Sequence, residues 1–464
     1  MILLVVVSLL SYVSQIILHP VYGSVGTRLH HYNVLFAVCL VGLFPIRLSK
    51  QTEELGMILL AAPLTVPFLF KYSGSWGPIY GPILTQAAMT WPCAFLASNK
   101  MRKLAVAIPP MCWAAEKILV QYVQPWIGIV WSRFSALLYL GAFTYRKFFI
   151  LPYILFVLNQ PHVKSGVTPA LLARLPPEYT YLDRRESITG MITVVENSKV
   201  GYRVLKCDHS LLGGLWSGIE GAEEESVYTA FLVQEAARLA HDGQNALIIG
   251  LGVGITAKSF YQHGLNVTAV EIDPVVHEFA GKYFGLPNVT VIYEDGREYI
   301  QRTEGWDYIV HDVFTGGSVP PHLFTVEMWM EVQKSLNRNG VLVVNMVGSI
   351  EDRSLTAVMS TLLHSFEYCR AFRDPLDQGS GPTNIAVFCR SVPIGFRNPT
   401  EDDFLNSIMR ERALSTFSDH EIEISGGEVI TDANNKLGEW QINDALEHWR
   451  VIRKVLADQV WINY

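Results

Sequence analysis

Three acidic residues and a glycine-rich turn are the groups best suited to chemistry in this chain of 464 residues. Glu271, Asp295 and Asp312 each follow a short apolar run rich in β-branched residues. Another apolar run, residues 246–249, leads into a turn that contains Gly250, Gly252 and Gly254. Glycine allows a backbone to turn tightly and to approach a ligand closely. The pattern predicts a nucleotide site.

The elements that position these residues are expected to form an α/β domain. Apolar strands are predicted at residues 246–250, 267–272, 289–293, 308–312 and 341–346. Helical stretches lie between them at residues 256–263, 274–283 and 327–336. This alternation is typical of a parallel, doubly wound, Rossmann-like sheet. The carboxyl ends of its strands line one crevice, so the three acids are expected to meet there.

The order of the acids distinguishes two nucleotide classes. Residues 252–257 fit the dinucleotide pattern GxGxxA, so NAD has to be considered. Ribose, adenine and a cationic group would require acceptors in the order Glu271, Asp295 and Asp312, which favours S-adenosylmethionine or a relative. The residues expected to bind this co-substrate are Gly250, Gly252, Gly254, Glu271, Asp295 and Gly296. No metal is expected, since the six cysteines include no CxxC pair.

The first third of the chain has a different composition. The whole chain is 50% hydrophobic and only 17% charged. Apolar runs near the length of about 20 residues that a membrane span requires occur at 2–20, 31–47, 56–71, 79–97, 104–122 and 125–143, with a shorter run at 148–158. We therefore expect an N-terminal α-helical polytopic membrane domain, residues 1–158, with six or seven spans.

Basic residues in the expected loops predict an orientation. Seven Lys and Arg follow the even-numbered spans and two follow the odd-numbered ones, which puts both termini in the cytosol. The expectation is a multi-pass integral membrane protein whose catalytic domain faces the cytosol. Glu116, Lys117 and Arg133 fall inside expected spans. They indicate either a transport pathway or pairing between neighbouring helices, and pairing is the favoured interpretation.

The remainder is expected to form a small β-rich subdomain at 159–215, the Rossmann-like domain at 216–400 and a polar helical extension at 401–464. Acidic residues outnumber basic ones after residue 158, by 40 to 25, which argues against a nucleic-acid partner. The cysteines are interpreted as free thiols in a reducing compartment. Two glycosylation triplets, Asn266-Val-Thr and Asn288-Val-Thr, fall on predicted core strands and are interpreted as chance matches.

Residues 185–350 resemble the spermidine synthase-like, or polyamine aminopropyltransferase, family. The resemblance includes Tyr228 ahead of the glycine turn, Glu271-Ile-Asp273, Asp295-Gly296 and Asp312. The run Pro-x-His-Leu-x-Thr-x-Glu from Pro320 to Glu327 is similar to the membrane-fused branch of that family.

The resemblance implies roles for individual residues. Glu271 would bind the ribose and Asp295 the adenine, while Asp312 would orient and deprotonate the attacking amine. The acceptor would lie near Tyr228, His322 and Glu327. His311 and His322 flank the same loop, as a second general base or as hydrogen-bonding loop residues. The implied reaction is transfer of an aminopropyl group from decarboxylated S-adenosylmethionine to a polyamine.

The sequence departs from the aminopropyltransferase pattern at three places. Val253 stands where that family has an Asp in the glycine turn, Thr315 replaces a second Asp, and Thr-Ala follows Tyr228 in place of His-Glu. One alternative is therefore an S-adenosylmethionine-dependent methyltransferase. Another is a non-catalytic, nucleotide-regulated membrane sensor or transporter. The expected partners are a small-molecule amine or a hydrophobic acceptor and the lipid bilayer, with a homodimer left open.

Overall fold

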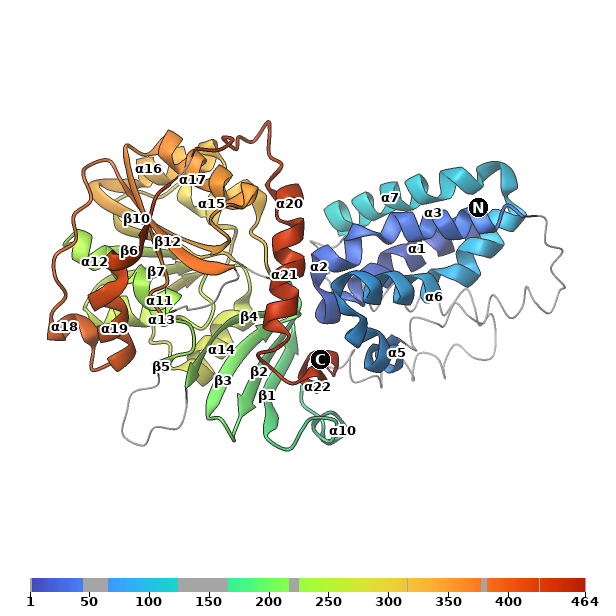
Figure 1. Cartoon of the computed structure of the whole chain (residues 1–464), viewed down its shortest axis with the longest axis horizontal. Helices are drawn as coiled ribbons and strands as arrows, with labels where there is room; N and C mark the ends of the chain where they lie inside the picture. The colour runs from blue at the N-terminus through green and yellow to red at the C-terminus, as the bar shows by residue number, and fades with distance from the viewer. Residues whose placement is uncertain are drawn as a thin grey trace. The chain divides into compact units, whose positions relative to one another are not determined.

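The computed structural model describes residues 2–44, 66–123, 166–216, 225–314, 316–376, 382–424 and 426–463. The chain divides into two compact units (Figure 1). The first, here called the helical unit, comprises Met1–Thr193, Cys207–Ser210 and Trp449–Tyr464. The second, the α/β unit, comprises Val194–Lys206 and Leu211–His448.

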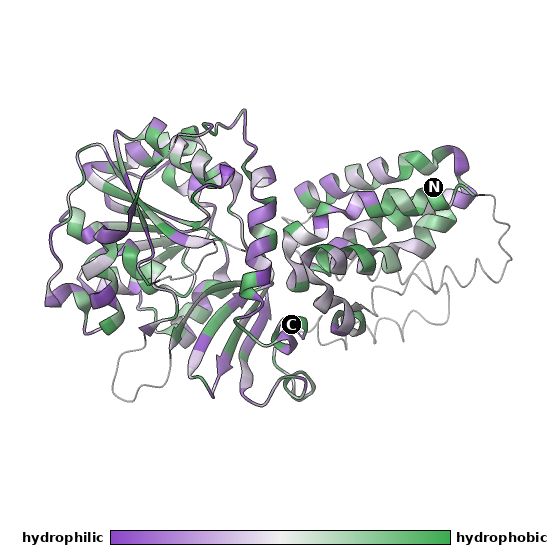
Figure 2. Cartoon of the chain, viewed as in Figure 1, coloured by the Kyte–Doolittle hydropathy of each residue, from purple (hydrophilic) through white to green (hydrophobic). Residues whose placement is uncertain are grey.

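The helical unit is built from mainly apolar helices of different lengths. They are α1 (Ile2–Ile16), α2 (His19–Leu29), α3 (His31–Val41), α5 (Val66–Ser73), η2 (Gly74–Trp76), α6 (Gly77–Lys100), η3 (Arg102–Ala107), α7 (Ile108–Ile118), η4 (Leu119–Val123), α10 (Pro169–Leu172) and α22 (Asp458–Ile462). Their apolar character is visible as the green ribbons of Figure 2. Side chains of α1, α2, α3 and α6, among them Val13, Val21, Leu35 and Met89, are buried in one hydrophobic cluster.

The predicted membrane domain of six or seven spans is wrong for the described part of the chain. Among these residues one helical stretch, Arg102–Tyr122, is long and apolar enough to cross a membrane. The helices α1, α2 and α3 have 15, 11 and 11 residues, or about 16–23 Å at 1.5 Å per residue. That is less than the roughly 30 Å of a bilayer core. The expected run 125–143, residues 148–158 and most of 56–71 lie outside the described residues.

The span prediction fails because an apolar stretch of sequence can continue across a point where one helix ends and the next begins. The first expected run, 2–20, is divided between two helices, because α1 ends at Ile16 and α2 begins at His19; α2 is itself kinked at Gly23, where φ is 72°. The longer helix α6, with 24 residues, buries polar side chains, including Gln86 and Thr90. The expected multi-pass localisation with a cytosolic catalytic domain fails with the spans, because the orientation was counted from the loops between them.

The charges expected inside spans take part in ordinary packing. The Glu116 carboxylate accepts a hydrogen bond from Gln15 Nε2 at 2.6 Å and another from the Tyr32 hydroxyl. The Lys117 ammonium lies 5.6 Å from the centre of the Trp113 ring. The Glu116 contacts join α7 to α1 and α3 and agree with pairing between helices, whereas Lys117 and Trp113 both lie on α7. Arg133 lies outside the described residues.

A five-stranded sheet has the order β1-β2-β3-β4-β5. Its strands are β1 (Tyr179–Glu186), β2 (Met191–Asn197), β3 (Tyr202–Cys207), β4 (Ser210–Trp216) and β5 (Glu225–Ser226). The segment 225–240 contains β5 and two short helices, α11 (Ala230–Gln234) and α12 (Ala237–Ala240).

The α/β unit is centred on an eight-stranded sheet with the order β13-β11-β12-β10-β9-β6-β7-β8. Its strands are β6 (Asn245–Ile249), β7 (Asn266–Val270), β8 (Thr290–Ile292), β9 (Trp306–His311), β10 (Leu336–Gly348), β11 (Tyr368–Arg373), β12 (Thr383–Arg390) and β13 (Glu421–Ile422). The five strands from β10 to β8 pair in parallel, and β12, β11 and β13 extend the sheet in antiparallel fashion. The expectation of a Rossmann-like α/β domain is confirmed.

Helices connect these strands or follow the last of them. They are α13 (Ile255–Gln262), α14 (Pro274–Phe284), α15 (Gly296–Ile300), η5 (Pro321–Leu323), α16 (Val326–Ser335), α17 (Arg353–Ser365), α18 (Glu401–Phe404), α19 (Ile408–Thr416), η6 (Phe417–His420), α20 (Leu437–Trp440) and α21 (Ile442–Ile452). Capping residues mark where some of these helices begin. The Asp273 side chain accepts a hydrogen bond from the Val275 amide, and Pro274 begins α14, as expected of an N-cap followed by proline.

Two cysteines of the antiparallel edge form a disulfide. Cys369 on β11 and Cys389 on β12 face each other in the strand register and are bonded. The expectation that all six cysteines are free thiols is therefore wrong for this pair. Cys39, Cys93, Cys112 and Cys207 are free and buried.

A buried ion pair joins two helical segments inside the α/β unit. Arg410 on α19 binds Glu235, which follows α11, through an Nε–Oε2 contact of 2.9 Å. The side chains are 9% and 1% exposed. Burial raises the pKa of Glu235, and Arg410 opposes this effect. The charge of Glu235 is therefore tolerated because Arg410 is present.

Replacing Arg410 should destabilise the α/β unit strongly. Arg410→Met leaves the Glu235 carboxylate buried without its cation, a change that costs about 3–5 kcal/mol in comparable pairs. Urea unfolding of the purified chain, followed by tryptophan fluorescence, measures it. The exposed neighbour Arg412 provides the control variant, Arg412→Met, for which the midpoint should barely change. Equal midpoints for the two variants would contradict the prediction.

Candidate active site

The glycine turn lies where β6 ends and α13 begins. Gly250 has a φ of +87°, and a Cβ atom at this position would lie 1.9 Å from the Asp312 carbonyl oxygen. A Cβ on Gly252, at φ +54°, would lie 2.5 Å from the Leu212 carbonyl oxygen. Gly254 is the residue that precedes α13. These close approaches explain why the turn is made of glycine.

Glu271 follows β7 and is attached to the glycine turn. Its Oε2 accepts a hydrogen bond from the Leu251 amide at 3.0 Å, and its Oε1 accepts one from the Asp273 amide at 2.9 Å. Burial raises the pKa of Glu271, while the backbone hydrogen bonds oppose that rise. The carboxylate is thereby held beside the turn, in the position in which a ribose acceptor would be required.

Asp295 precedes α15 and serves as its N-cap. Its Oδ1 accepts a hydrogen bond from the Arg297 amide, and its Oδ2 lies 2.9 Å from His322 Nε2. The hydrogen bond from His322 is the main cause of the lowered pKa of Asp295. Gly296 beside it has no room for a side chain, since a Cβ would lie 2.4 Å from Ile249 Cγ2.

Asp312 follows β9 and is held by two side-chain amides. Gln234 Nε2 donates to its Oδ2 at 2.8 Å, and Asn345 Nδ2 donates to its Oδ1 at 2.9 Å. Thr256 in turn donates to Gln234 Oε1 at 2.7 Å. Burial raises the pKa of Asp312, and the two amides lower it. Each carboxylate oxygen retains a further lone pair for a substrate N–H group.

A cavity joins Asp312 to the glycine turn. Its lining combines main chain of the turn, apolar side chains and three polar groups: Phe231, Gln234, Ile248, Gly250, Leu251, Val253, Gly254, Ile255, Thr256, Ala257 and Asp312. Val253 is buried and faces Gly213 on β4, where a Cβ would lie 2.6 Å from Val253 Cγ2. Asp312 is the one acidic residue among those that line this cavity.

The residues predicted to contact the acceptor are distributed over two places. Tyr228 lies beside Phe231, at 6.2 Å between ring centres. Its buried hydroxyl has no hydrogen-bond partner among the described residues, and burial raises its pKa. His322 binds Asp295, and Glu327 accepts a hydrogen bond from the Asp432 amide. None of the three lines the cavity at Asp312.

His311 does not fit the interpretation as a second general base. Its ring lies 4.8 Å from Phe324 and 5.0 Å from Trp329, centre to centre, in the core of the unit. Burial lowers its pKa to about 3. A ring that stays neutral and enclosed contributes to packing instead of proton transfer.

Sequence reasoning missed the two amides that hold Asp312. Gln234 lies in a helix with no chemical motif around it. Asn345 carried a usable signal, because it is a lone amide inside the apolar run Val-Val-Asn-Met-Val. A polar side chain in a central strand needs a hydrogen-bond partner, and the neighbouring strand β9 supplies Asp312.

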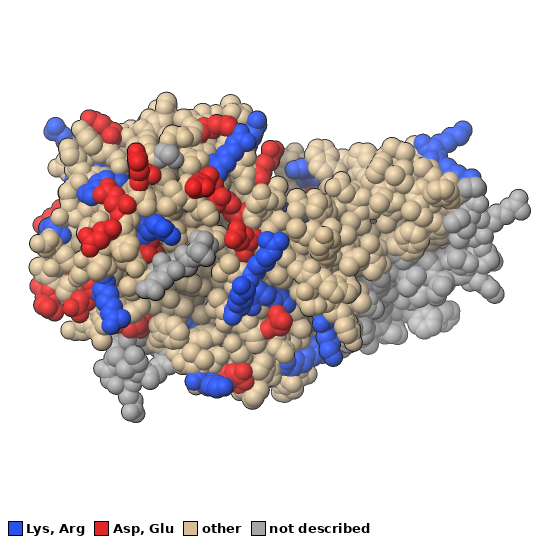
Figure 3. Space-filling view, in the orientation of Figure 1, with Lys and Arg blue, Asp and Glu red and all other residues tan. Residues whose placement is uncertain are grey.

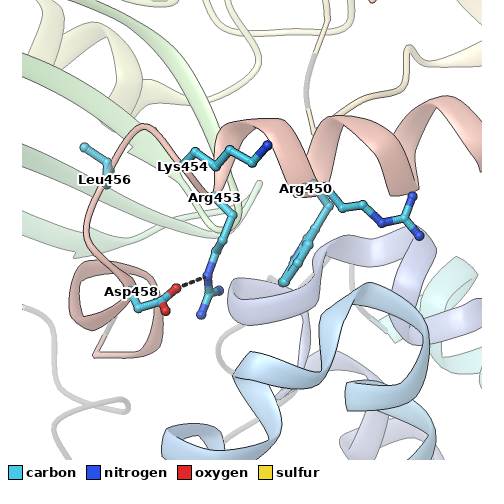
Figure 4. Close-up of a pocket in the computed structure, with 6 residues that line it drawn as sticks. Arg450, Arg453, Lys454, Leu456 and Asp458 are labelled. Carbon is cyan, nitrogen blue, oxygen red and sulfur yellow. Dashed lines mark hydrogen bonds and ion pairs between the residues drawn. The ribbon is translucent and has the colours of Figure 1, made fainter. Parts of the chain in front are cut away.

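The helical unit has a hollow of its own, lined by Trp449, Arg450, Arg453, Lys454, Leu456 and Asp458 (Figure 4). Arg453 Nε binds Asp458 Oδ1 at 2.8 Å. This hollow has no glycine turn, and its single lining acid is occupied by that ion pair. Of the residues predicted for the site, Gly250, Gly254 and Asp312 line the cavity at Asp312, whereas Gly252, Glu271, Asp295 and Gly296 are not among its lining residues. Figure 3 shows acidic side chains distributed over the visible face of the α/β unit.

Comparisons with known proteins identify the family. Residues 225–370 match the family model described as the spermine/spermidine synthase domain. The N-terminal histidine N-methyltransferase of Emericella nidulans is 33% identical over 536 residues, covering 99% of this chain and 96% of that protein. The polyamine aminopropyltransferase of Vibrio vulnificus is 31% identical over 159 residues, covering 32% of this chain and 50% of that protein.

Among solved structures, a probable spermidine synthase from Corynebacterium glutamicum has a TM-score of 0.43 at 19% identity and covers 54% of this chain and 95% of its own. The relatives are methyltransferases or aminopropyltransferases, so the protein is an alkyl transferase whose co-substrate is S-adenosylmethionine or its decarboxylated form. The chain belongs to the spermidine synthase-like family, together with the N-terminal histidine N-methyltransferase to which it is similar along almost its whole length.

Proposed function

We propose that this protein transfers a methyl group from S-adenosylmethionine to a nitrogen of an N-terminal histidine on a polypeptide. The whole-length similarity to an N-terminal histidine N-methyltransferase supports this reaction. The similarity to polyamine aminopropyltransferases is confined to about a third of the chain.

The observation that carries the proposal is the single acid of the cavity. A polyamine carries several ammonium groups and calls for several carboxylates, whereas the cavity lining offers Asp312 alone. Val253, buried against Gly213, leaves the turn without a carboxylate. An uncharged turn suits the intact donor, whose own carboxylate would repel an Asp at that position.

The chemistry assigned to Asp312 follows from its hydrogen bonds. A neutral imidazole has one N–H donor and one nitrogen with a lone pair. Asp312, fixed by Gln234 and Asn345, would accept the N–H and direct the other nitrogen toward the methyl group. The new N–C bond forms as the C–S bond breaks, and the electron pair stays on sulfur. The excess proton of the methylated ring passes through Asp312 to solvent.

Glu271 and the glycine turn are assigned to the nucleoside of the donor. The Glu271 carboxylate is fixed by the Leu251 and Asp273 amides, so binding a ribose requires little reorganisation. Asp295 and Gly296 are assigned to the adenine, in a position where His322 keeps Asp295 ionised. These assignments agree with the family resemblance of the same residues.

The donor and acceptor can be tested together. The purified chain should bind S-adenosylmethionine more tightly than its decarboxylated form in calorimetry. It should methylate a peptide that begins with histidine, while an otherwise identical peptide beginning with alanine stays unmodified in mass spectrometry. Tighter binding of the decarboxylated donor, with transfer of an aminopropyl group to putrescine, would instead establish an aminopropyltransferase.

A Val253→Asp variant should lose affinity for the intact donor more than for the decarboxylated one.

Asp312→Asn should lower kcat by about 10²–10⁴-fold, the usual contribution of a positioned acid or base. Donor affinity should stay within a few-fold, because the ribose and adenine contacts are untouched. The matched control is Asp307→Asn on the same strand, where the acid accepts hydrogen bonds from the Gln244 and Asn245 amides at the opposite end. Full turnover in the Asp312 variant would disprove the mechanism.

The pH profile reports the state of Asp312. Activity requires the carboxylate, so the rate falls as pH drops through the pKa of Asp312, which burial holds above its usual value. Asn345→Leu removes a hydrogen bond that favours the charged form, so this pKa rises. The acidic limb of kcat against pH should move to higher pH. Asn337→Leu is the control, since Asn337 lies on the same strand and donates to Asp307; an unmoved limb in the Asn345 variant would contradict the assignment.

A further inference from the structure

The disulfide of the α/β unit constrains where this unit matures. Cys369 and Cys389 are directly opposed on β11 and β12 and are bonded. Forming this bond removes two protons and two electrons from the thiols, by exchange with the disulfide of an oxidoreductase. Structural disulfides persist in oxidising compartments and are rare where glutathione keeps thiols reduced.

Two asparagine triplets provide a second, independent observation. Asn266-Val-Thr268 and Asn288-Val-Thr290 both match the acceptor pattern for N-linked glycans. The structure places both asparagine side chains on the surface. Asn266 begins β7, and Asn288 lies two residues before β8. The two threonines are partners in the parallel register of these strands.

The geometry removes the reason for dismissing these triplets. The apolar side chains of β7 are buried, whereas Asn266 at its first position is exposed. Its Nδ2 donates to Asn245 Oδ1 at 3.2 Å. A glycan replaces one of the two amide hydrogens, so the other remains for this contact.

The position of the pair is compatible with an active enzyme. β7 begins at Asn266 and ends at Val270, and Glu271 of the candidate site follows immediately. Parallel pairing puts both asparagines at the amino edge of the sheet and the three acids at its carboxyl edge. Glycans at the amino edge would leave the cavity at Asp312 open.

We propose that the α/β unit matures in an oxidising, glycosylating compartment of the secretory pathway, with Asn266 and Asn288 as N-glycan acceptors. The co-reactant is a lipid-linked pyrophosphate oligosaccharide. The asparagine nitrogen forms a bond to C1 of the first sugar as the bond from C1 to the pyrophosphate oxygen breaks. The lipid pyrophosphate leaves with the electron pair, and the amide proton goes to a base of the transferase.

The chain contains its own negative control. Asn398-Pro399-Thr400 has an exposed asparagine and a threonine at the correct spacing. Proline at the middle position blocks the acceptor pattern, so Asn398 should stay unmodified. Asn398→Gln therefore matches the two test substitutions chemically and should have no effect on glycan content.

The experiment uses the full chain produced in yeast. Digestion with an endoglycosidase should increase its mobility in denaturing gels. Asn266→Gln and Asn288→Gln should each remove one step of that shift, and the double variant should show none. If the unsubstituted chain shows only one step of mobility shift, and one of the two substitutions abolishes it, the other asparagine is not an acceptor. If the unsubstituted chain shows no mobility shift, both acceptor assignments are overturned.

The disulfide has a separate readout. Alkylation of the denatured chain without reductant, followed by mass spectrometry, should leave Cys369 and Cys389 unlabelled and joined in one peptide pair. Labelled thiols at both positions would overturn the oxidising compartment. Neither result depends on which alkyl group the enzyme transfers, so these outcomes are separate from those of the proposed reaction.

Discussion

Parallel pairing of β9, β6 and β7 determines the position of the site. Ile249, the last residue of β6, is level with His311 on one side and with Val270 on the other. Gly250, Glu271 and Asp312 each follow directly after one of these three paired residues, so all three lie at the same edge of the sheet. The Asp312 amide donates to the Ile249 carbonyl at 2.8 Å, and the Gly250 amide donates to the Val270 carbonyl at 2.9 Å. A slip of one residue in either pair would separate the acids from the turn.

The neutral hydrogen-bond donors of Asp312 affect the basicity of its carboxylate. Asp312 is buried enough to become more basic, yet both oxygens accept hydrogen bonds from neutral amides. Neutral donors stabilise the carboxylate less than a cation would. In the proposed reaction, Asp312 would therefore stay basic enough to accept a substrate proton, whereas an Arg or Lys partner would lower its basicity. Glu271 follows the same principle, with backbone amides as its donors.

The sequence predicted the parallel core because its strands contain short apolar runs, and because β6, β7 and β9 are followed directly by Gly250, Glu271 and Asp312. It failed where the evidence is non-local. The expected spans rest on composition, which does not register the break between α1 and α2 or the polar side chains that α6 buries. The Cys369–Cys389 bond depends on the antiparallel pairing of β11 and β12. Gln234 reaches Asp312 across 78 positions of sequence, a separation that no local motif encodes.

The change from Asp to Val in the glycine turn connects fold and specificity. In a polyamine pocket each charge-assisted hydrogen bond is worth about 1.5–3 kcal/mol, so a turn without its carboxylate gives up roughly ten- to hundredfold in affinity for a cation. The same loss removes repulsion toward a donor that carries its own carboxylate. Val253 occupies the space with an apolar side chain against Gly213, so the change is built into the packing of β4 against the turn. In the proposed reaction, this packing would suit an intact donor and an acceptor with one neutral nitrogen.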